Sequence, residues 1–165
     1  MEYLNTLCPS TLYYIDESGI EHGLYSTHGW SLRGEKIYAN VPGSHRERTN
    51  IISASQNGKL VAPWVYEKSC TSDLVNVWLK ECLLPAIPRG SVLIFDNASF
   101  HKSPLTRKLI EDAGCHLLFL PTYSPDLNPI EHIWFVLKSL LRKVLPDSSN
   151  PSDTICDYVS QCCVS

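Results

Sequence analysis

The sequence predicts an α/β protein with a mixed five-stranded sheet flanked by helices. Two runs, Ser91–Phe95 and Cys115–Leu120, are too short for helices and largely apolar, as are strands buried in a parallel or mixed sheet. Helical patterns follow each of these runs. The pair Asn57-Gly58, between two further strand-like segments, predicts an antiparallel hairpin in the same protein.

The first predicted element is the strand Thr11–Ile15, which is rich in aromatic and β-branched residues. We expect it to end at Asp16 and Glu17, with a turn at Ser18-Gly19. The following region, residues 21–41, predicts a loop that contains one or two short strands. An acidic pair therefore directly follows the first strand.

The hairpin is predicted to consist of Asn50–Ser55 and Leu60–Tyr66, and a helix comes after it. Thr71 or Ser72 is a suitable cap for this helix, and Pro85 and Pro88 would end it. Its spacing predicts one buried face, formed by Leu74, Val77, Trp78 and Cys82.

The strand Ser91–Phe95 stops at an acidic residue, Asp96. Ser103 and Pro104 then have the sequence of a helix start, and Gly114 ends that helix. Its apolar face is predicted to comprise Leu105, Leu109 and Ala113. Carboxylates at the C-terminal ends of central strands are where open α/β sheets place their chemistry, so Asp96 is a candidate functional residue.

The proline-rich loop 121–129 leads into the longest predicted helix, which we expect to begin near Ile130 with Asn128 as its cap. Glu131 lies in its first turn, where a capping role is the ordinary explanation for a glutamate. The predicted core residues of this helix are Ile130, Ile133, Trp134, Leu137, Leu140 and Leu141. A loop at residues 146–152 and a final helix over 153–162 complete the chain, with Ile155, Tyr158, Val159 and Cys162 inward.

The composition limits the class of protein. The chain has 165 residues, of which 44% are apolar, so we expect one domain with a sizeable core. Its net charge of −3 gives no general attraction to nucleic acid, and any such site must be a local basic patch. Seven cysteines without a Cys-x-x-Cys pair suit reduced thiols in a cytoplasmic protein. We see no secretory leader and no apolar run near 20 residues, so we expect no membrane contact.

The two acidic strand ends suggest a metal site. If the first strand and the Ser91 strand are neighbours, Asp16 and Asp96 lie at equivalent ends of strands about 4.8 Å apart. A cation between them would relieve their repulsion, and hard oxygen ligands favour Mg²⁺ or Mn²⁺. Glu131 would complete the site. Two such ions, about 3.5 to 4 Å apart, can activate a water or a 3′-hydroxyl for attack on a phosphodiester.

Three segments carry a resemblance to a known family: Asp16–Gly19, Phe95–His101 and Leu120–Trp134, the last containing Tyr-Ser-Pro-Asp-Leu-Asn-Pro-Ile-Glu. In this order they resemble the catalytic domain of mariner-like transposases and their bacterial insertion-sequence relatives. The 34 residues between Asp96 and Glu131 match the spacing of that group's Asp-Asp-Glu triad. The resemblance covers nearly the whole chain.

The resemblance implies an RNase H-like fold and DNA cleavage and strand joining in cut-and-paste transposition, with two Mg²⁺ or Mn²⁺ ions. By position, Asp16, Asp96 and Glu131 would be the catalytic metal ligands. The implied partners are transposon ends, target DNA and a second copy of the chain, in the bacterial cytoplasm or nucleoid. Family members usually carry helix-turn-helix domains ahead of this point, which we expect to be absent here, so recognition of transposon ends would need another part.

Further side chains are candidates for supporting the site. Asn97 and His101 flank Asp96 and could orient a ligand or contact phosphate, although both are also ordinary residues beside a helix. Lys138 and Arg142 share one side of the long helix with Glu131 and could follow DNA phosphates, or simply suit the helix dipole.

Four other polar or aromatic residues lie in or near these segments. Trp30, near Arg33 and Lys36, is a candidate contact for DNA or a partner. Glu17 should point to the opposite face of its strand from Asp16 and be solvated or structural. Asp126 is better explained as a turn residue, and His132 as a structural or surface residue.

Three alternative functions remain at this point. A phosphatase-type enzyme would need a second aspartate two residues after Asp96, where Ala98 stands. A generic RNase H-like nuclease or resolvase would share the metal chemistry, and only the specific segment before Glu131 argues against it. An inactive remnant that holds DNA or a partner is the third, although the presence of all three carboxylates argues for activity.

Overall fold

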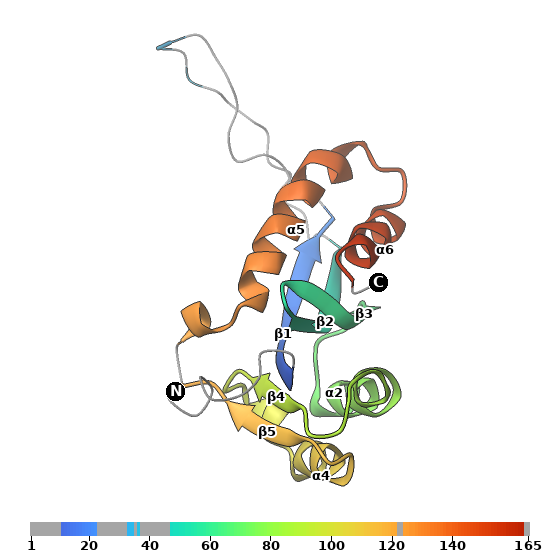
Figure 1. Cartoon of the computed structure of the whole chain (residues 1–165). Coiled ribbons are helices and arrows are strands. Elements are labelled where there is room, and N and C mark those ends of the chain that lie inside the picture. Colours follow the sequence, from blue (N-terminus) through green and yellow to red (C-terminus); the bar gives the residue numbers. More distant parts are fainter. Residues whose placement is uncertain (1–10, 23–32, 35, 37–46, 122–123, 164–165) are drawn as a thin grey trace.

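The computed structural model describes residues 11–22, 33–34, 36, 47–121 and 124–163. These residues contain one five-stranded sheet with the order β3-β2-β1-β4-β5 (Figure 1). The strands are β1 (Leu12–Glu21), β2 (Arg48–Gln56), β3 (Lys59–Tyr66), β4 (Val92–Phe95) and β5 (His116–Phe119). β1, β2 and β3 pair antiparallel, whereas β4 is parallel to both β1 and β5. The predicted mixed sheet is therefore confirmed.

The helical elements follow the strands in the predicted order. They are α2 (Ser72–Trp78), η2 (Leu79–Leu83), α3 (Leu84–Ala86), η3 (Ser99–Lys102), α4 (Pro104–Asp112), η4 (Pro125–Leu127), α5 (Ile130–Val144), η5 (Leu145–Asp147) and α6 (Pro151–Gln161). The helices form two groups, with α2 and α4 at one end of Figure 1 and α5 and α6 at the other. Among the helices of the described residues, none is long and apolar enough to cross a membrane.

The two helical groups pack on opposite faces of β1. A single strand can contact both groups because its successive side chains alternate between its two faces. Tyr13 and Ile15 belong to the core cluster that contains Val75 and Trp78 of α2. Ile20 belongs to the cluster that contains residues of α5 and α6. Odd-numbered residues of β1 therefore face α2 and α4, and even-numbered residues face α5.

β1 is longer than expected, and this corrects the predicted turn at Ser18-Gly19. The strand continues because β2 pairs with it along its whole second half, out to the pair formed by Glu21 and Arg48. Asp16 consequently lies within the strand, opposite Ser53, rather than at its end. Most of the predicted loop at residues 21–41 lies outside the described residues.

The hairpin prediction is confirmed. Asn57 and Gly58 have φ values of 51° and 76°, the left-handed conformation required at both positions of a tight hairpin turn. They connect β2 to β3 directly.

Three predicted core positions are wrong: Val77, Leu105 and Leu140 are exposed by 48%, 52% and 40%. After α2 the helix becomes π-helical over η2, which changes the spacing and turns Leu79 and Leu83 inward. In α4 the buried residues are Thr106 and Ile110, because Thr106 donates a buried hydrogen bond to Asn76 Oδ1 on α2 at 2.7 Å.

The last helix, α6, packs beside the edge strand β3. The Leu60 amide of β3 donates to the Cys162 carbonyl, just after α6, at 2.8 Å. Ile155 and Val159 of α6 are buried, as expected. The six cysteines among the described residues are free thiols, which agrees with the prediction for that part of the chain.

Candidate active site

Asp16 and Asp96 stand at matching positions where two parallel strands separate. The last paired residues of β1 and β4 are Tyr14 and Ile94, and each aspartate lies two residues further along its strand. The expected adjacency of these two strands is therefore confirmed, although only Asp96 follows the end of its strand.

Asp16 faces α5, and a tryptophan of that helix binds it. The indole Nε1 of Trp134 donates to Asp16 Oδ2 at 3.1 Å, and Trp134 itself is buried. Burial is the main reason that the pKa of Asp16 rises to about 7. The negative charges of Glu17, Glu131 and Asp96 raise this pKa further. A bound cation would therefore stabilise the ionised form of Asp16, which burial and the neighbouring carboxylates disfavour.

Glu131 is brought to the same region by α5. It precedes Trp134 by three residues, so the two side chains lie on neighbouring positions of one helix face, and Trp134 contacts Asp16. Glu131 is exposed, and its charge acts on Asp16. The helix therefore delivers a third carboxylate within electrostatic reach of the first.

The predicted Asn128 cap is wrong. The N-cap of α5 is Pro129, which has no side chain to cap with, and the Glu131 amide donates to the backbone carbonyl of Asn128 at 3.1 Å. The Asn128 side chain is buried, and its Oδ1 has no hydrogen-bond partner within the described part of the chain. Asp126, Asn128, Glu131, His132 and Phe135 line one pocket of about 560 Å³.

Asp96 is held by two hydrogen bonds that end on the same oxygen. His101 Nδ1 donates to Asp96 Oδ1 at 2.6 Å, and the Ala98 amide donates to that atom at 3.0 Å. The His101 bond is the main cause of a lowered pKa for Asp96. Both bonds leave Oδ2 available to a ligand on the partly exposed side of the carboxylate.

His101 is fully buried and lies between two carboxylates. Its Nε2 donates to Glu17 Oε1 at 2.7 Å, while its Nδ1 binds Asp96. Burial lowers the pKa of His101, but the bonds to Asp96 and Glu17 outweigh it and raise the pKa to about 9. The ring is therefore an imidazolium at neutral pH, which allows both nitrogens to donate. Glu17 faces away from Asp16 as expected, but it is 15% exposed and bonded, so the alternative of a solvated residue is wrong.

Basic side chains lie beside the carboxylates on the α5 side. Burial lowers the pKa of Lys138, and the nearby cations Arg48 and Arg142 lower it further. The charges of Glu131 and Asp16 act in the opposite direction, which places Lys138 within their electrostatic reach. Lys138 and Arg142 therefore lie near one another on α5, as predicted, within electrostatic reach of the carboxylates. The Arg48 side chain of β2 lies over Gly19 on the other face of the sheet, although its charge also acts on Lys138. Arg48 was not predicted, because its pairing with β1 is a long-range contact.

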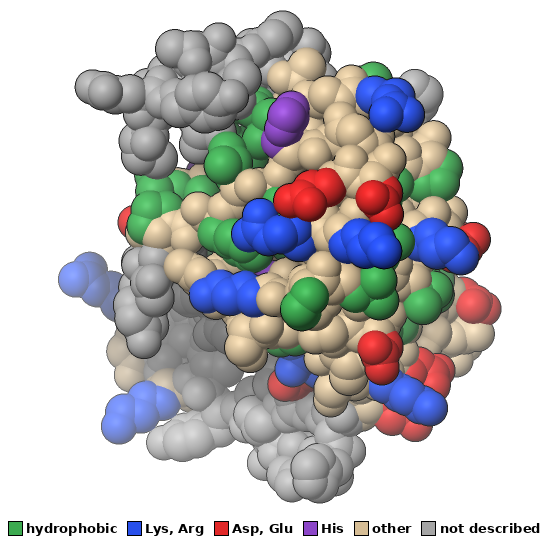
Figure 2. All heavy atoms as spheres, turned by 90° about the horizontal axis from the view of Figure 1, so that it is seen from below, with side chains coloured by type: hydrophobic (Ala, Val, Ile, Leu, Met, Phe, Trp, Pro, Cys, Tyr) green, Lys and Arg blue, Asp and Glu red, His purple; other side chains and the backbone are tan. Residues whose placement is uncertain are grey.

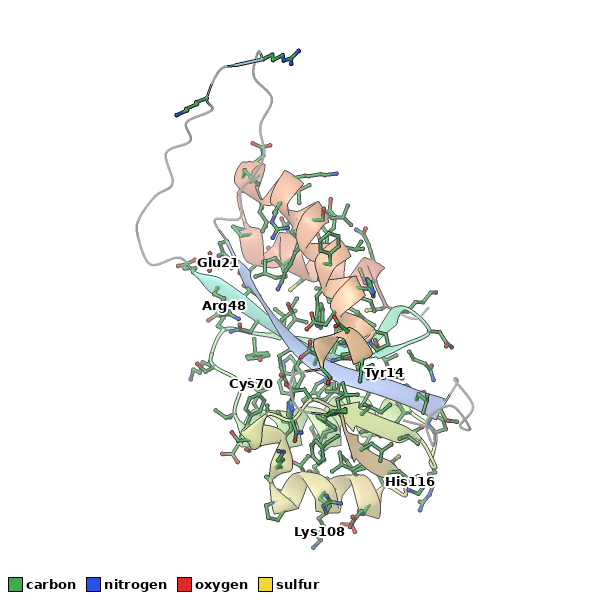
Figure 3. The ribbon with its side chains drawn as sticks, turned by 90° about the vertical axis from the view of Figure 1, so that its left-hand side faces the viewer. Tyr14, Glu21, Arg48, Cys70, Lys108 and His116 are labelled. Atoms are coloured by element: carbon green, nitrogen blue, oxygen red, sulfur yellow. The ribbon has the colours of Figure 1, made fainter. Side chains whose placement is uncertain are left out.

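The end of the molecule that carries α4 has side chains of both charges. Figure 2 shows the end of the molecule that carries α4, where Lys and Arg side chains are mixed with Asp and Glu. In Figure 3, Glu21, Arg48 and Cys70 follow one another along one side of the molecule, and Lys108 of α4 lies far from them.

The remaining predicted site residues have mixed outcomes. Asn97 Nδ2 donates to the Leu120 carbonyl at 3.2 Å, so it ties the loop after β4 to the end of β5. Trp30 lies outside the described residues. His132 is exposed at the surface, in keeping with its prediction, and Asp126 is an exposed residue of η4.

The donor set suits a hard divalent cation, because all three candidate ligands are carboxylates. Repulsion from Glu131 and Asp96 on Asp16 is the electrostatic condition that such a cation would relieve. Within the described residues, no group of three or more His, Cys, Asp or Glu side chains is placed so that it could hold a metal ion as it stands. Glu131 and Asp96 nevertheless lie within electrostatic reach of Asp16. That the three carboxylates bind a metal ion together is a proposal.

Comparison with known proteins identifies the family. A family model described as DDE superfamily endonuclease matches residues 11–150. The chain belongs to this endonuclease family. It is 43% identical over 69 residues to the Tc1 transposase of Caenorhabditis elegans, covering 42% of this chain and 25% of that protein. It is 29% identical over 136 residues to a 39 kDa protein of the insertion element IS630 from Shigella sonnei, covering 80% of this chain and 39% of that protein.

The fold agrees with this membership. The Mos1 transposase in a paired-end complex with its left transposon end matches with a TM-score of 0.70 at 14% identity, over 97% of this chain and 54% of that one. The catalytic domain of Mos1 mariner transposase matches with a TM-score of 0.65 over 97% of this chain and 72% of that one. The predicted RNase H-like transposase fold is confirmed. The chain spans between a quarter and two fifths of the curated relatives above.

Proposed function

We propose that this chain is the catalytic part of a transposase, which cuts and joins DNA strands in cut-and-paste transposition with the aid of Mg²⁺ or Mn²⁺. The observation that carries the proposal is the grouping of Asp16, Asp96 and Glu131 from β1, β4 and α5 in a DDE endonuclease-family chain. Solved structures of the Mos1 mariner paired-end complex with Mn and of the Mos1 transposase catalytic domain with Mg support the choice of metal.

In this proposal the three carboxylates hold the metal. Bound there, two divalent ions would activate a water or a 3′-hydroxyl and stabilise the departing oxygen of a phosphodiester. Asp96 would offer Oδ2, because its Oδ1 is occupied by His101 and Ala98. Trp134 would keep the Asp16 carboxylate oriented through Oδ2.

The cations beside the carboxylates would receive the DNA backbone. Lys138 and Arg142 on α5 form a local positive group on a chain of net charge −3. Such a group suits phosphate contacts without base recognition. Mos1 transposase has been solved in a paired-end complex with its left transposon end, which supports transposon DNA as the partner. We further propose a working form with two copies of the chain, acting in the cytoplasm or nucleoid.

The test is nicking of supercoiled plasmid DNA by the purified 165-residue chain with Mg²⁺ or Mn²⁺. We expect slow, weakly specific nicking that requires the metal and is lost in Asp96→Asn. The matched control is Asp112→Asn, an exposed aspartate at the end of α4, which should nick like the unaltered chain. Nicking that survives Asp96→Asn, or its absence from the unaltered chain, would contradict the proposal.

A further inference from the structure

Three side chains link the two faces of the sheet around β1. Glu17 Oε1 accepts a hydrogen bond from His101 Nε2 at 2.7 Å, and His101 Nδ1 donates to Asp96 Oδ1 at 2.6 Å. Glu17 projects toward the α2 side, opposite to Asp16, and is 84 residues from His101 in the sequence. These two hydrogen bonds therefore connect Glu17, on the reverse side of the sheet, to Asp96, a candidate metal ligand.

The His101 ring is confined by its surroundings. It is fully buried, and its centroid lies 4.9 Å from that of Phe95 and 4.4 Å from that of Phe100. The two aromatic rings pack against the imidazole, and the hydrogen bonds at its two nitrogens oppose rotation about its Cβ–Cγ bond. Glu17 supplies the bond at the nitrogen that points away from Asp96.

The consequence for Asp96 follows from which oxygen is used. Both described hydrogen bonds to its carboxylate end on Oδ1, so they fix the carboxylate plane and leave Oδ2 for a ligand. If the ring turned, the shorter of these bonds would be lost, and the carboxylate could rotate. Residues behind a metal ligand commonly set its orientation in this way.

We infer that Glu17 is a positioning residue for the metal site: through His101 it holds the Asp96 carboxylate in the orientation that binds the cation. This inference rests on the proposed metal site. Glu17 itself does not touch the metal, since it lies on the reverse face of β1.

Glu17 also lines a surface cavity on that reverse face. The cavity is about 390 Å³ in volume, and Arg48, Tyr66, Glu67 and Cys70 are among its other lining residues. Glu67 is exposed and has the same charge as Glu17, but no described hydrogen bond connects it to His101. Glu67 is therefore a matched control within the same cavity.

The experiment measures Mn²⁺ binding to the 165-residue chain without DNA, by electron paramagnetic resonance of the free ion. Two variants separate reach from charge. Glu17→Asp keeps the charge but is one methylene too short to meet His101 Nε2, whereas Glu17→Gln loses the charge but keeps an oxygen acceptor at the same reach. Asp96→Asn defines the binding that belongs to the site, and Glu67→Gln is the control.

We expect Glu17→Asp to weaken Asp96-dependent Mn²⁺ binding about tenfold, at the low end of losses known for residues behind metal ligands. Glu17→Gln and Glu67→Gln should stay within about twofold of the unaltered chain. The melting temperatures of the variants, measured without metal, show whether a loss reflects unfolding. Equal binding by Glu17→Asp and the unaltered chain, or a larger loss in Glu17→Gln than in Glu17→Asp, would overturn the inference.

Failure of the proposed metal site and misfolding of the variant can each be told apart from failure of this inference. Mn²⁺ binding by the unaltered chain that Asp96→Asn leaves intact would overturn the proposed metal site, and this inference with it. If Glu17→Asp does not fold, NMR of the unaltered chain decides: we expect the Nε2–H proton of His101, which faces Glu17, to exchange slowly with water. A His101 Nε2 that carries no slowly exchanging proton would show that Glu17 does not hold the ring.

Discussion

Replacing Asp16 with asparagine should stabilise the metal-free chain while removing its metal site. The pKa of Asp16 is raised from 3.8 to about 7 in the fold, mainly by burial. A difference of about 3 units corresponds to about 4 kcal/mol of lost stability once the carboxylate is ionised. Solvent relaxation around the charge reduces this figure, so we expect Asp16→Asn to gain about 2 to 4 kcal/mol at pH 8. Asparagine can still accept the hydrogen bond from Trp134.

The sign of the pH dependence follows from the raised pKa. The folded chain holds the Asp16 proton more tightly than the unfolded chain, so this contribution is fully present below about pH 4 and is lost as the pH rises through about 7. The advantage of Asp16→Asn should therefore shrink to about 1 kcal/mol or less at pH 4.5.

The assay is urea unfolding in EDTA at pH 4.5 and pH 8, with Asp112→Asn as the control. Added Mg²⁺ should then stabilise the unaltered chain at pH 8 and leave Asp16→Asn unchanged. A variant that is no more stable than the unaltered chain at pH 8, or a gain that is equal at both pH values, would refute the reasoning about a buried charge.

Three further predictions concern the packing and the thiols. Trp134→Phe keeps the buried ring but removes the donor to Asp16, and should cost about 1 to 2 kcal/mol in urea unfolding; no cost would show that this hydrogen bond contributes nothing. Ile110→Ala should cost about 2 to 5 kcal/mol and Leu105→Ala under about 1 kcal/mol, because only Ile110 is buried; similar costs would contradict the assigned face of α4. Burial raises the pKa of Cys70 to about 11, so its alkylation by iodoacetamide, followed by mass spectrometry, should accelerate up to about pH 11; a plateau near pH 8.5 would contradict this.

Local sequence signals predicted most of the secondary structure, because those signals act over a few residues. Asn57-Gly58 requires left-handed backbone that few other pairs adopt, and the short apolar runs before Asp96 and Leu120 had no polar face to expose. The neighbouring position of the first strand and β4 also followed from the matching acidic residues.

Two features of the fold, the full length of β1 and the π-helix over η2, were not predicted from the sequence. Ser18-Gly19 has turn composition, but β2 pairs with it and keeps β1 extended to Glu21. Similarly, the change to a π-helix over η2 arises within a continuous helical pattern and adds Leu79 and Leu83 to the buried side chains, while Trp78 stays buried as predicted. Neither feature has a signal within its own few residues.

The candidate site shows the same division. The three carboxylates were predicted from their positions beside predicted elements, and in the structure the charges of Glu131 and Asp96 raise the pKa of Asp16. The partner of His101 on the reverse face, Glu17, could not be found in this way, because the contact joins residues 84 positions apart. Alternation along β1 gave the direction of Glu17 but not what it would meet.

The most direct test of the proposed site is a crystal structure of the chain with Mn²⁺, in which anomalous scattering locates the ions. We predict manganese bound between Asp16, Asp96 and Glu131, with Asp96 contributing Oδ2. Manganese located elsewhere, or bound without Asp16 or Glu131, would contradict the account.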